Sequence, residues 1–305
     1  MKEKNNIAAH TAALGANLFF GGNFSAMKYV IPAVIAPFAL NGLRVLFATS
    51  LFWLCLLATR KKFAALRKPL DKKDIPRLIV CGITGVSINQ LLLVKGLSYT
   101  TAVHGSLLML VAPIFIVVAS AFILKERLSS LKLLGLVFGI VGACVLIFAR
   151  NKVDVSATNI PLGDTLIILN AISYSIYFVY VKPLMQRYSA MQVITWVFTI
   201  GVVGIMPFAW GELQHTIWEN FTIYHWVAVS FTLLFATFGA YLLTIYSIAN
   251  IGPGASSAYI YTQPFFAALV AYLVYHDTLD ATKITASVLI FLGVYLVNKK
   301  KRQLT

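Results

Sequence analysis

Amide and phenol side chains recur at helical spacing within apolar stretches of this sequence. Asn170, Tyr174 and Tyr177 stand at i, i+4 and i+7, on one face of a helix, and Tyr259 and Gln263 form a similar stripe. Such groups beside aromatic rings suit a small zwitterionic or amphipathic ligand, since hydrogen bonds orient it while the rings cover its apolar part. We therefore expect ten residues to bind substrate: Asn23, Asn89, Gln90, Asn170, Tyr174, Tyr177, Trp196, Tyr241, Tyr259 and Gln263.

The alternative role for each of these side chains is an interhelical hydrogen bond, which contributes only about 0.6 kcal/mol on average in membranes. Arg44 lies about eight residues into an apolar stretch. A substrate carboxylate is one partner for it, but we expect it to snorkel to the outer interface or to bond to backbone carbonyls.

Two prolines are expected near the middle of helices, at Pro113 and Pro264. A proline lacks the backbone N–H and leaves the carbonyl four residues earlier without its helical donor. Such breaks are tolerated where a cavity or neighbouring helices satisfy the backbone. We expect the two prolines to act in gating; the alternative is a static kink that helps packing.

Acidic residues are missing from the middle third of every apolar stretch. Proton-coupled transporters commonly place an acid there, so a carboxylate relay is disfavoured and facilitated diffusion or exchange is the simpler mechanism. The sequence also lacks a phosphate-binding loop of the G-x-x-x-x-G-K-[ST] type, which excludes ATP hydrolysis within this chain.

The elements that hold these residues must be membrane helices. Of 305 residues, 59% are hydrophobic and only 11% are charged, too few charges to cover a soluble surface. The three cysteines are too few, and odd in number, for a disulfide framework. Unbroken apolar runs of about 20 residues predict transmembrane helices rather than a β-barrel. We expect ten spans, at 9–31, 36–58, 77–98, 101–124, 131–149, 162–183, 190–210, 224–247, 254–275 and 281–298.

The net charge of +15 is explained by topology rather than by a nucleic-acid partner. With the N-terminus inside, nineteen Lys and Arg residues fall in inner segments and five in outer ones. The positive-inside rule then predicts a multi-pass protein of the plasma (inner) membrane with both termini in the cytoplasm.

An internal repeat relates the two halves of the sequence. A shift of 151 residues places Pro113 on Pro264, Gly142 on Gly293 and Gln90 on Tyr241. The predicted units are therefore two five-helix repeats, 9–149 and 162–298, joined by the linker 150–161. Because five is odd, the second repeat must enter the membrane from the opposite side, and such inverted repeats surround a central cavity in many secondary transporters.

These motifs resemble the drug/metabolite transporter superfamily in its ten-helix EamA form, over nearly the whole chain. The first helix carries GGNFS at 21–25, although Gly22 or Phe20 stands where the family commonly has Trp. Further matching segments are LRVLFA at 43–48, LVAPIF at 110–115, KERL at 125–128, GPGAS at 252–256, QPFF at 263–266 and HDTL at 276–279. The resemblance implies transport of small metabolites, often amino acids or related compounds, through a central cavity.

We thus expect a secondary transporter that uses alternating access, with a small-molecule substrate and the lipid bilayer as its partners. A lipid-carrier translocase on the same fold and a channel remain alternatives. An intramembrane hydrolase built on Ser87 and His104 lacks its usual sequence context, so no enzyme activity, cofactor, metal or ATPase subunit is expected. The sequence is compatible with a monomer.

Overall fold

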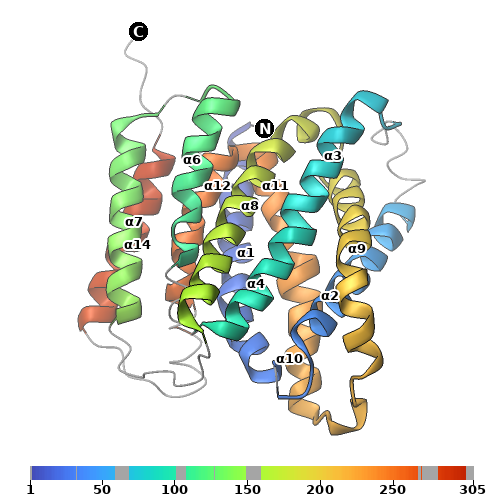
Figure 1. The fold of residues 1–305 in the computed structure, drawn as a ribbon. Helices are drawn as coiled ribbons and strands as arrows, with labels where there is room; N and C mark the ends of the chain where they lie inside the picture. Colours follow the sequence, from blue (N-terminus) through green and yellow to red (C-terminus); the bar gives the residue numbers. More distant parts are fainter. Residues whose placement is uncertain are drawn as a thin grey trace.

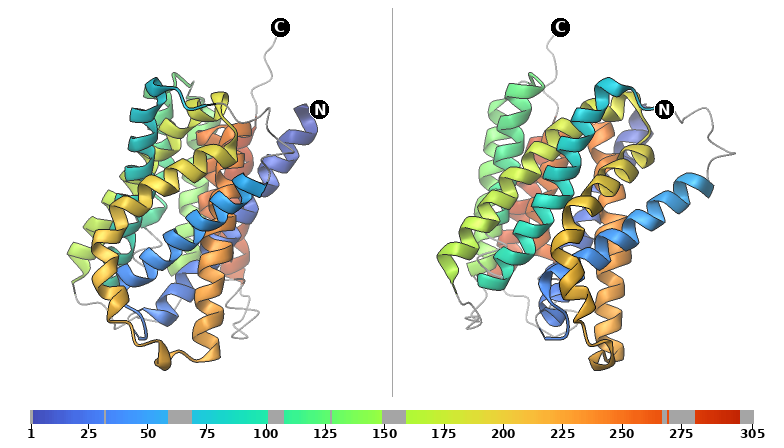
Figure 2. Two further views of the ribbon diagram at one scale, coloured as in Figure 1. Left: turned by 90° about the vertical axis from the view of Figure 1, so that its right-hand side faces the viewer. Right: turned by 45° about the vertical axis from the view of Figure 1, so that its right-hand side comes forward.

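The chain folds into a bundle of helices that run roughly alongside one another (Figure 1, Figure 2). The computed structural model describes residues 2–31, 33–58, 69–100, 108–126, 128–148, 159–266, 269 and 281–299. Every regular element among these residues is helical. In a bilayer core, a helix satisfies its own backbone N–H and C=O groups, which is why long apolar segments fold this way.

Among the described residues, five continuous helical segments are long and apolar enough to cross a membrane: Pro37–Ala58, Lys72–Tyr99, Ile160–Arg187, Ala190–Gln214 and Ile223–Ile251. The principal α-helices are α1 (Lys2–Val30), α2 (Pro37–Ala58), α3 (Ile75–Gly82), α4 (Ile88–Tyr99), α6 (Ala112–Ile123), α7 (Ser130–Phe148), α8 (Ile160–Arg187), α9 (Ala190–Gln214), α10 (Ile223–Leu233), α11 (Ala240–Ile251), α12 (Pro253–Ser257) and α14 (Ala281–Asn298). Short 3₁₀ segments are η2 (Lys72–Asp74), η4 (Trp218–Asn220) and η6 (Ala258–Thr262).

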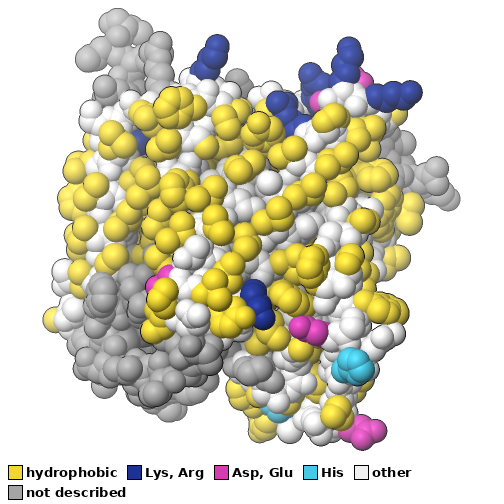
Figure 3. All heavy atoms as spheres, viewed as in Figure 1, with side chains coloured by type: hydrophobic (Ala, Val, Ile, Leu, Met, Phe, Trp, Pro, Cys, Tyr) yellow, Lys and Arg dark blue, Asp and Glu magenta, His cyan; other side chains and the backbone are white. Residues whose placement is uncertain are grey.

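The flanks of the bundle are apolar. Large hydrophobic side chains point outward from several helices, among them Phe122 (81% exposed) on α6 and Val203 (72%) on α9. Figure 3 shows this hydrophobic flank, with Lys and Arg side chains gathered mainly at the end of the bundle where α3 begins. An apolar belt with charges confined to the ends is the surface of a multi-pass membrane protein.

Two of the spanning segments contain a π-helical turn at corresponding places. Segment η3 (Ile83–Ser87) joins α3 to α4, and η5 (Leu234–Gly239) joins α10 to α11. The first residues of the two segments are 151 positions apart, the spacing of the sequence repeat. Such π-turns are rare and occur frequently at functional sites.

Helices α7 and α14 form a closely packed pair at one edge of the bundle (Figure 1, Figure 2). A methyl group on Gly142 would lie 2.7 Å from the carbonyl oxygen of Ala286, and one on Gly293 would lie 2.6 Å from that of Gly135. Gly142 and Gly293 are 151 residues apart, as are Gly135 and Ala286. The two contacts therefore correspond to each other under a shift of 151 residues.

A cluster of hydrogen bonds around the Asp74 carboxylate connects η2 and α3 to the end of α8. Arg187 Nη1 donates to both carboxylate oxygens of Asp74 at 3.0 Å, and the Tyr188 hydroxyl donates to Asp74 Oδ2 at 2.8 Å. The same hydroxyl accepts the backbone N–H of Asp71 at 3.0 Å. Because α3 continues through η3 into α4, this cluster fixes α4 alongside α8.

Glu212, near the end of α9, caps the start of α2. Its Oε2 accepts the backbone N–H groups of Phe38 at 2.7 Å and Ala39 at 2.9 Å. These N–H groups have no partner within their own helix, and the positive end of the helix dipole favours an anion there.

We expect Glu212→Ala to lower the free energy of unfolding by about 1–2 kcal/mol, because the two N–H groups lose a charged acceptor. The measurement is the thermal unfolding midpoint in detergent. Glu219→Ala is the matched control, since Glu219 is exposed on η4. Equal midpoints for the two variants would show that the cap contributes nothing.

Candidate functional site

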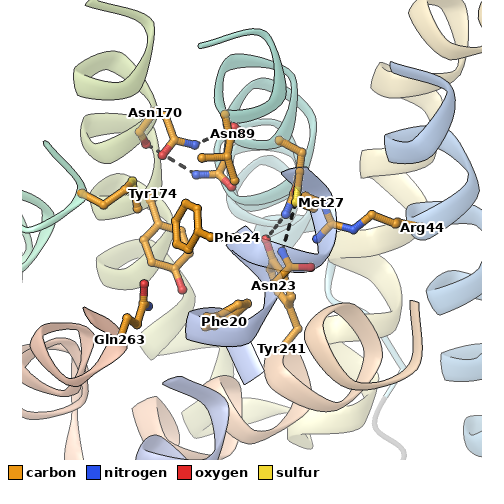
Figure 4. Close-up of a pocket in the computed structure, with 13 residues that line it drawn as sticks. Phe20, Asn23, Phe24, Met27, Arg44, Asn89, Asn170, Tyr174, Tyr241 and Gln263 are labelled. Atoms are coloured by element: carbon orange, nitrogen blue, oxygen red, sulfur yellow. Dashed lines mark hydrogen bonds between the residues drawn. The ribbon is translucent and has the colours of Figure 1, made fainter. Parts of the chain in front are cut away.

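A cavity lies between helices of both halves of the chain. Its empty volume is about 520 Å³, which includes space open to solvent. Figure 4 shows side chains from several helices converging on it. Its walls combine amides, aromatic rings and one cation, and are formed by Phe20, Asn23, Phe24, Met27, Arg44, Asn89, Gln90, Leu93, Met109, Asn170, Tyr174, Tyr241 and Gln263.

Helix α1 contributes one complete face. Phe20, Asn23, Phe24 and Met27 stand at i, i+3, i+4 and i+7, so they line the cavity together. The sequence prediction included only Asn23 from this face. The same spacing rule that found the α8 stripe would have found its three apolar members.

Asn89 on α4 and Asn170 on α8 join the two helices across the cavity wall (Figure 4). Asn170 Nδ2 donates to the carbonyl oxygen of Asn89 at 2.6 Å, and Asn89 Nδ2 approaches the carbonyl oxygen of Asn170 at 3.5 Å. Asn170 Oδ1 has no hydrogen-bond partner among the described residues.

Gln90 and Tyr241 meet at the centre of the molecule. Gln90 Nε2 donates to the Tyr241 hydroxyl, which lies 3.5 Å from the carbonyl oxygen of Gly85 in η3. The two side chains come from positions 151 residues apart. They therefore correspond to each other under the 151-residue shift of the sequence, and they touch in the structure.

Arg44 on α2 is 2% exposed and reaches the cavity from the side (Figure 4). Its Nε donates to Thr237 Oγ1 of η5 at 2.9 Å, and its Nη1 lies 3.5 Å from Met27 Sδ. Within the described part of the chain, no carboxylate forms an ion pair with it. The expectation that Arg44 snorkels to the interface is wrong, because the π-turn of η5 supplies a hydroxyl that holds it inside.

Tyr174 and Gln263 form the opposite wall (Figure 4). The Tyr174 ring packs edge-on against Phe178, with centroids 4.7 Å apart. Gln263 Nε2 donates to Asn17 Oδ1 of α1 at 2.8 Å, which joins the segment after η6 to the first helix.

Three residues expected to bind substrate do not line this cavity. Tyr177 is fully buried against Gly85, Trp196 packs edge-on against Trp53 with centroids 5.4 Å apart, and the Tyr259 hydroxyl lies 2.8 Å from His10 Nδ1. Tyr177 shares a face with Asn170 but lies about 10 Å further along α8, at 1.5 Å per residue. Helical spacing gives the direction of a side chain but not the depth of the cavity.

Each of the two prolines stands at the start of an α-helical stretch that follows a break in the α-helix. Pro113 is in the first turn of α6, where the missing N–H breaks no helical hydrogen bond. Residues 108–109 are helical and a turn at 110–111 separates them from α6, so Pro113 directly follows a break in the helical path, and its role in gating stays a prediction. Pro264 stands two residues after the end of η6. It cannot donate an α-helical hydrogen bond to the Ile260 carbonyl, and that carbonyl accepts the Gln263 N–H instead.

An apolar helical bundle that encloses a polar cavity is the architecture of a membrane transport protein. The chain belongs to the EamA-like transporter family, whose model matches twice, at residues 7–148 and 161–299.

Relatives from bacteria and archaea are transporters by name. An "Uncharacterized transporter" of Archaeoglobus fulgidus is 25% identical over 93% of this chain and 96% of its own length. The "Uncharacterized transporter YetK" of Bacillus subtilis is 25% identical over 98% and 89%. The "Probable terminal-alkyne amino-acid exporter" of Streptantibioticus cattleyicolor is 26% identical over 75% and 74%. A crystal structure with 20% identity shares the fold, with a TM-score of 0.73 over 96% of this chain and 95% of the other.

Proposed function

We propose that the protein is a secondary transporter of small metabolites, most of all amino acids or related amphipathic compounds, working by alternating access. The cavity between the two halves carries this proposal. Its polar groups can orient a ligand, its aromatic groups can cover an apolar moiety, and the surrounding bundle is apolar.

The two halves are proposed to be inverted five-helix repeats, 9–149 and 162–298, with 150–161 as the linker. Three observations support a two-fold relation: the Gln90–Tyr241 contact, the paired π-turns η3 and η5, and the corresponding contacts of α7 and α14. An axis through the cavity would let each half open it to one side of the membrane in turn.

The proposed location is the plasma (inner) membrane, with both termini in the cytoplasm. Support comes from the cation distribution in the sequence and from the Lys and Arg side chains at the end of the bundle where α3 begins (Figure 3). The substrate class draws on the cavity's chemistry and on a relative whose name specifies an amino-acid substrate.

The proposed mechanism is exchange or facilitated diffusion, because none of the thirteen cavity residues is an acid that could relay a proton. Two alternatives remain on the same fold. A lipid-carrier translocase would need a long apolar groove open to the lipid, and a channel would need a continuous pore with a charged or carbonyl filter.

Flux measurements in proteoliposomes test this function. Thermal stabilisation across a metabolite panel first selects the ligand, because a compound that binds only the folded state raises its stability. The selected compound is expected to show saturable flux and to accelerate its own exchange when present on both sides. Flux that rises linearly with concentration would indicate a channel, and flux driven by an imposed pH gradient would contradict the absence of proton coupling.

A further inference from the structure

Three amide oxygens at the cavity are buried without a hydrogen-bond donor among the described residues: Asn23 Oδ1, Gln90 Oε1 and Asn170 Oδ1. Their side chains are at most 6% exposed. In each case the amide nitrogen already has an acceptor, respectively Met27 Sδ, the Tyr241 hydroxyl and the Asn89 carbonyl oxygen. Because each amide nitrogen is already hydrogen-bonded, the atom without a partner is the amide oxygen, which is a hydrogen-bond acceptor. Buried acceptors are nearly always paired in proteins, so each of these oxygens has capacity for a donor such as a bound ligand.

Arg44 has the opposite deficiency, because its guanidinium has N–H donors that lack acceptors in the described part of the chain. A guanidinium carries five N–H donors and cannot be neutralised under physiological conditions. One N–H is bonded to Thr237 Oγ1, and Nη1 has only the weak thioether acceptor of Met27 at 3.5 Å. With the side chain 2% exposed and no ion-pair partner among the described residues, the guanidinium has capacity for an anion.

The two deficiencies lie side by side. Asn23 Nδ2 is 3.1 Å from Met27 Sδ and Arg44 Nη1 is 3.5 Å from the same sulfur atom, so the amide and the guanidinium are neighbours (Figure 4). A cationic donor and a neutral acceptor that are neighbours match a molecule whose carboxylate and ammonium groups are attached to one carbon.

We propose that Arg44 binds the carboxylate of an α-amino acid while the side-chain oxygen of Asn23 accepts its ammonium group. This inference rests on the proposed function and adds to it the residues that recognise the head group. Arg44 forms charge-assisted bonds to the carboxylate, for which a guanidinium is geometrically suited. Phe20, Phe24 and Tyr174 then offer an aromatic wall to the amino acid side chain.

The arrangement also predicts what the site rejects. An amine without a carboxylate would bring a second positive charge next to Arg44 and leave the guanidinium unpaired. A carboxylate without an amine would leave Asn23 Oδ1 without a donor. Both groups of the zwitterion are therefore needed for full affinity.

Matched ligands separate these contributions. The probes are L-alanine, L-leucine, L-phenylalanine and L-glutamine, each with its carboxamide, together with 3-phenylpropanoate. The readout is the apparent dissociation constant from thermal stabilisation of the full-length protein in detergent. The wild type is expected to bind at least one amino acid at least tenfold more tightly than its carboxamide. The amino acid that binds the wild type most tightly is the one whose acid-to-carboxamide affinity ratio is then measured in the variants.

Arg44→Gln is expected to reduce the ratio of acid to amide affinity to within about twofold. Leu93→Ala is the matched control: it removes an apolar wall contact, so both affinities should fall together and their ratio should persist. Asn23→Leu keeps Arg44 and is expected to bring phenylalanine and 3-phenylpropanoate to similar affinity. This variant tests the site independently should Arg44→Gln fail to fold.

The inference would be overturned if the wild type bound acid and amide equally, if Arg44→Gln kept the tenfold preference, or if none of the amino acids bound. In the last case, saturable transport of another metabolite would leave the proposed function intact. Absence of saturable flux for every compound in the metabolite panel would instead contradict the proposed function itself.

Discussion

Tyr174→Ala and Gln263→Ala are each expected to reduce saturable substrate flux to the level of protein-free liposomes. Tyr174 supplies the aromatic wall of the cavity, and Gln263 connects that wall to Asn17 of α1. Removing the ring takes away a large part of the apolar contact, and removing the amide frees the segment after η6 from the first helix. The measurement is initial uptake into proteoliposomes against substrate concentration.

The control for this loss is Tyr224→Ala. It makes the same chemical change at a side chain that is 71% exposed on α10 and is not one of the cavity residues. Its flux should stay within about twofold of wild type, at equal reconstitution and equal thermal stability. Wild-type flux in both cavity variants would show that the substrate passes elsewhere.

Gly293→Val is expected to have the largest effect on stability. A Cβ at this position would lie 2.6 Å from both the Gly135 carbonyl oxygen and the Gly139 nitrogen. These are backbone atoms of α7, so relief requires α7 and α14 to separate over their whole contact. Overpacking typically costs about 1–3 kcal/mol, and a backbone clash belongs at or above the upper end of that range.

The measurement for Gly293→Val is the yield of monodisperse protein and its unfolding midpoint in detergent. Gly211→Ala on α9 is the matched control, because nothing lies within 4 Å of the position its Cβ would take. The control should be neutral or slightly stabilising, since alanine favours a helix more than glycine does. Normal yield and midpoint for Gly293→Val would refute the close approach of α7 and α14.

The long apolar segments could be predicted from the sequence because one physical quantity, the length of an apolar run, determines them. The prediction of 36–58 agrees closely with α2, and that of 190–210 falls within α9. The predicted span 101–124 fared differently, since residues 101–107 lie outside the described residues and α6 begins only at Ala112. Residues 108–109 are helical, and a turn at 110–111 separates them from α6, a break that the hydropathy of this segment alone does not reveal.

Most polar residues of the cavity could be recognised from the cost of placing an amide or phenol in an apolar helix. Asn89, Asn170 and Gln263 all reach the cavity on this argument. Tyr177 and Trp196 satisfy the same rule yet pack against other helices, because their depth or direction is determined by partners far away in sequence. A single helix carries no information about those partners.

Arg44 illustrates what sequence patterns lack. An arginine near a helix end is expected to extend its charge toward water. Here Thr237, on the π-turn of another helix, holds the side chain inside the bundle. A π-turn depends on tertiary packing, and no characteristic amino-acid pattern marks it in a sequence. Neither the turn nor its hydrogen bond to Arg44 could therefore be predicted.

The central claim is that substrate occupies the cavity between the two halves, and protection of a cavity thiol tests it most directly. Leu93→Cys would be placed in a background in which Cys55, Cys81 and Cys144 are replaced by alanine. Gln214→Cys, at the exposed end of α9, serves as the reference thiol.

The measured quantity is the rate of alkylation by N-ethylmaleimide, with and without the compound that stabilises the protein most. Saturating ligand is expected to slow alkylation of Leu93→Cys at least fivefold, with a concentration dependence that matches its apparent affinity, and to leave Gln214→Cys unchanged. Equal alkylation rates at Leu93→Cys with and without saturating ligand would contradict the account.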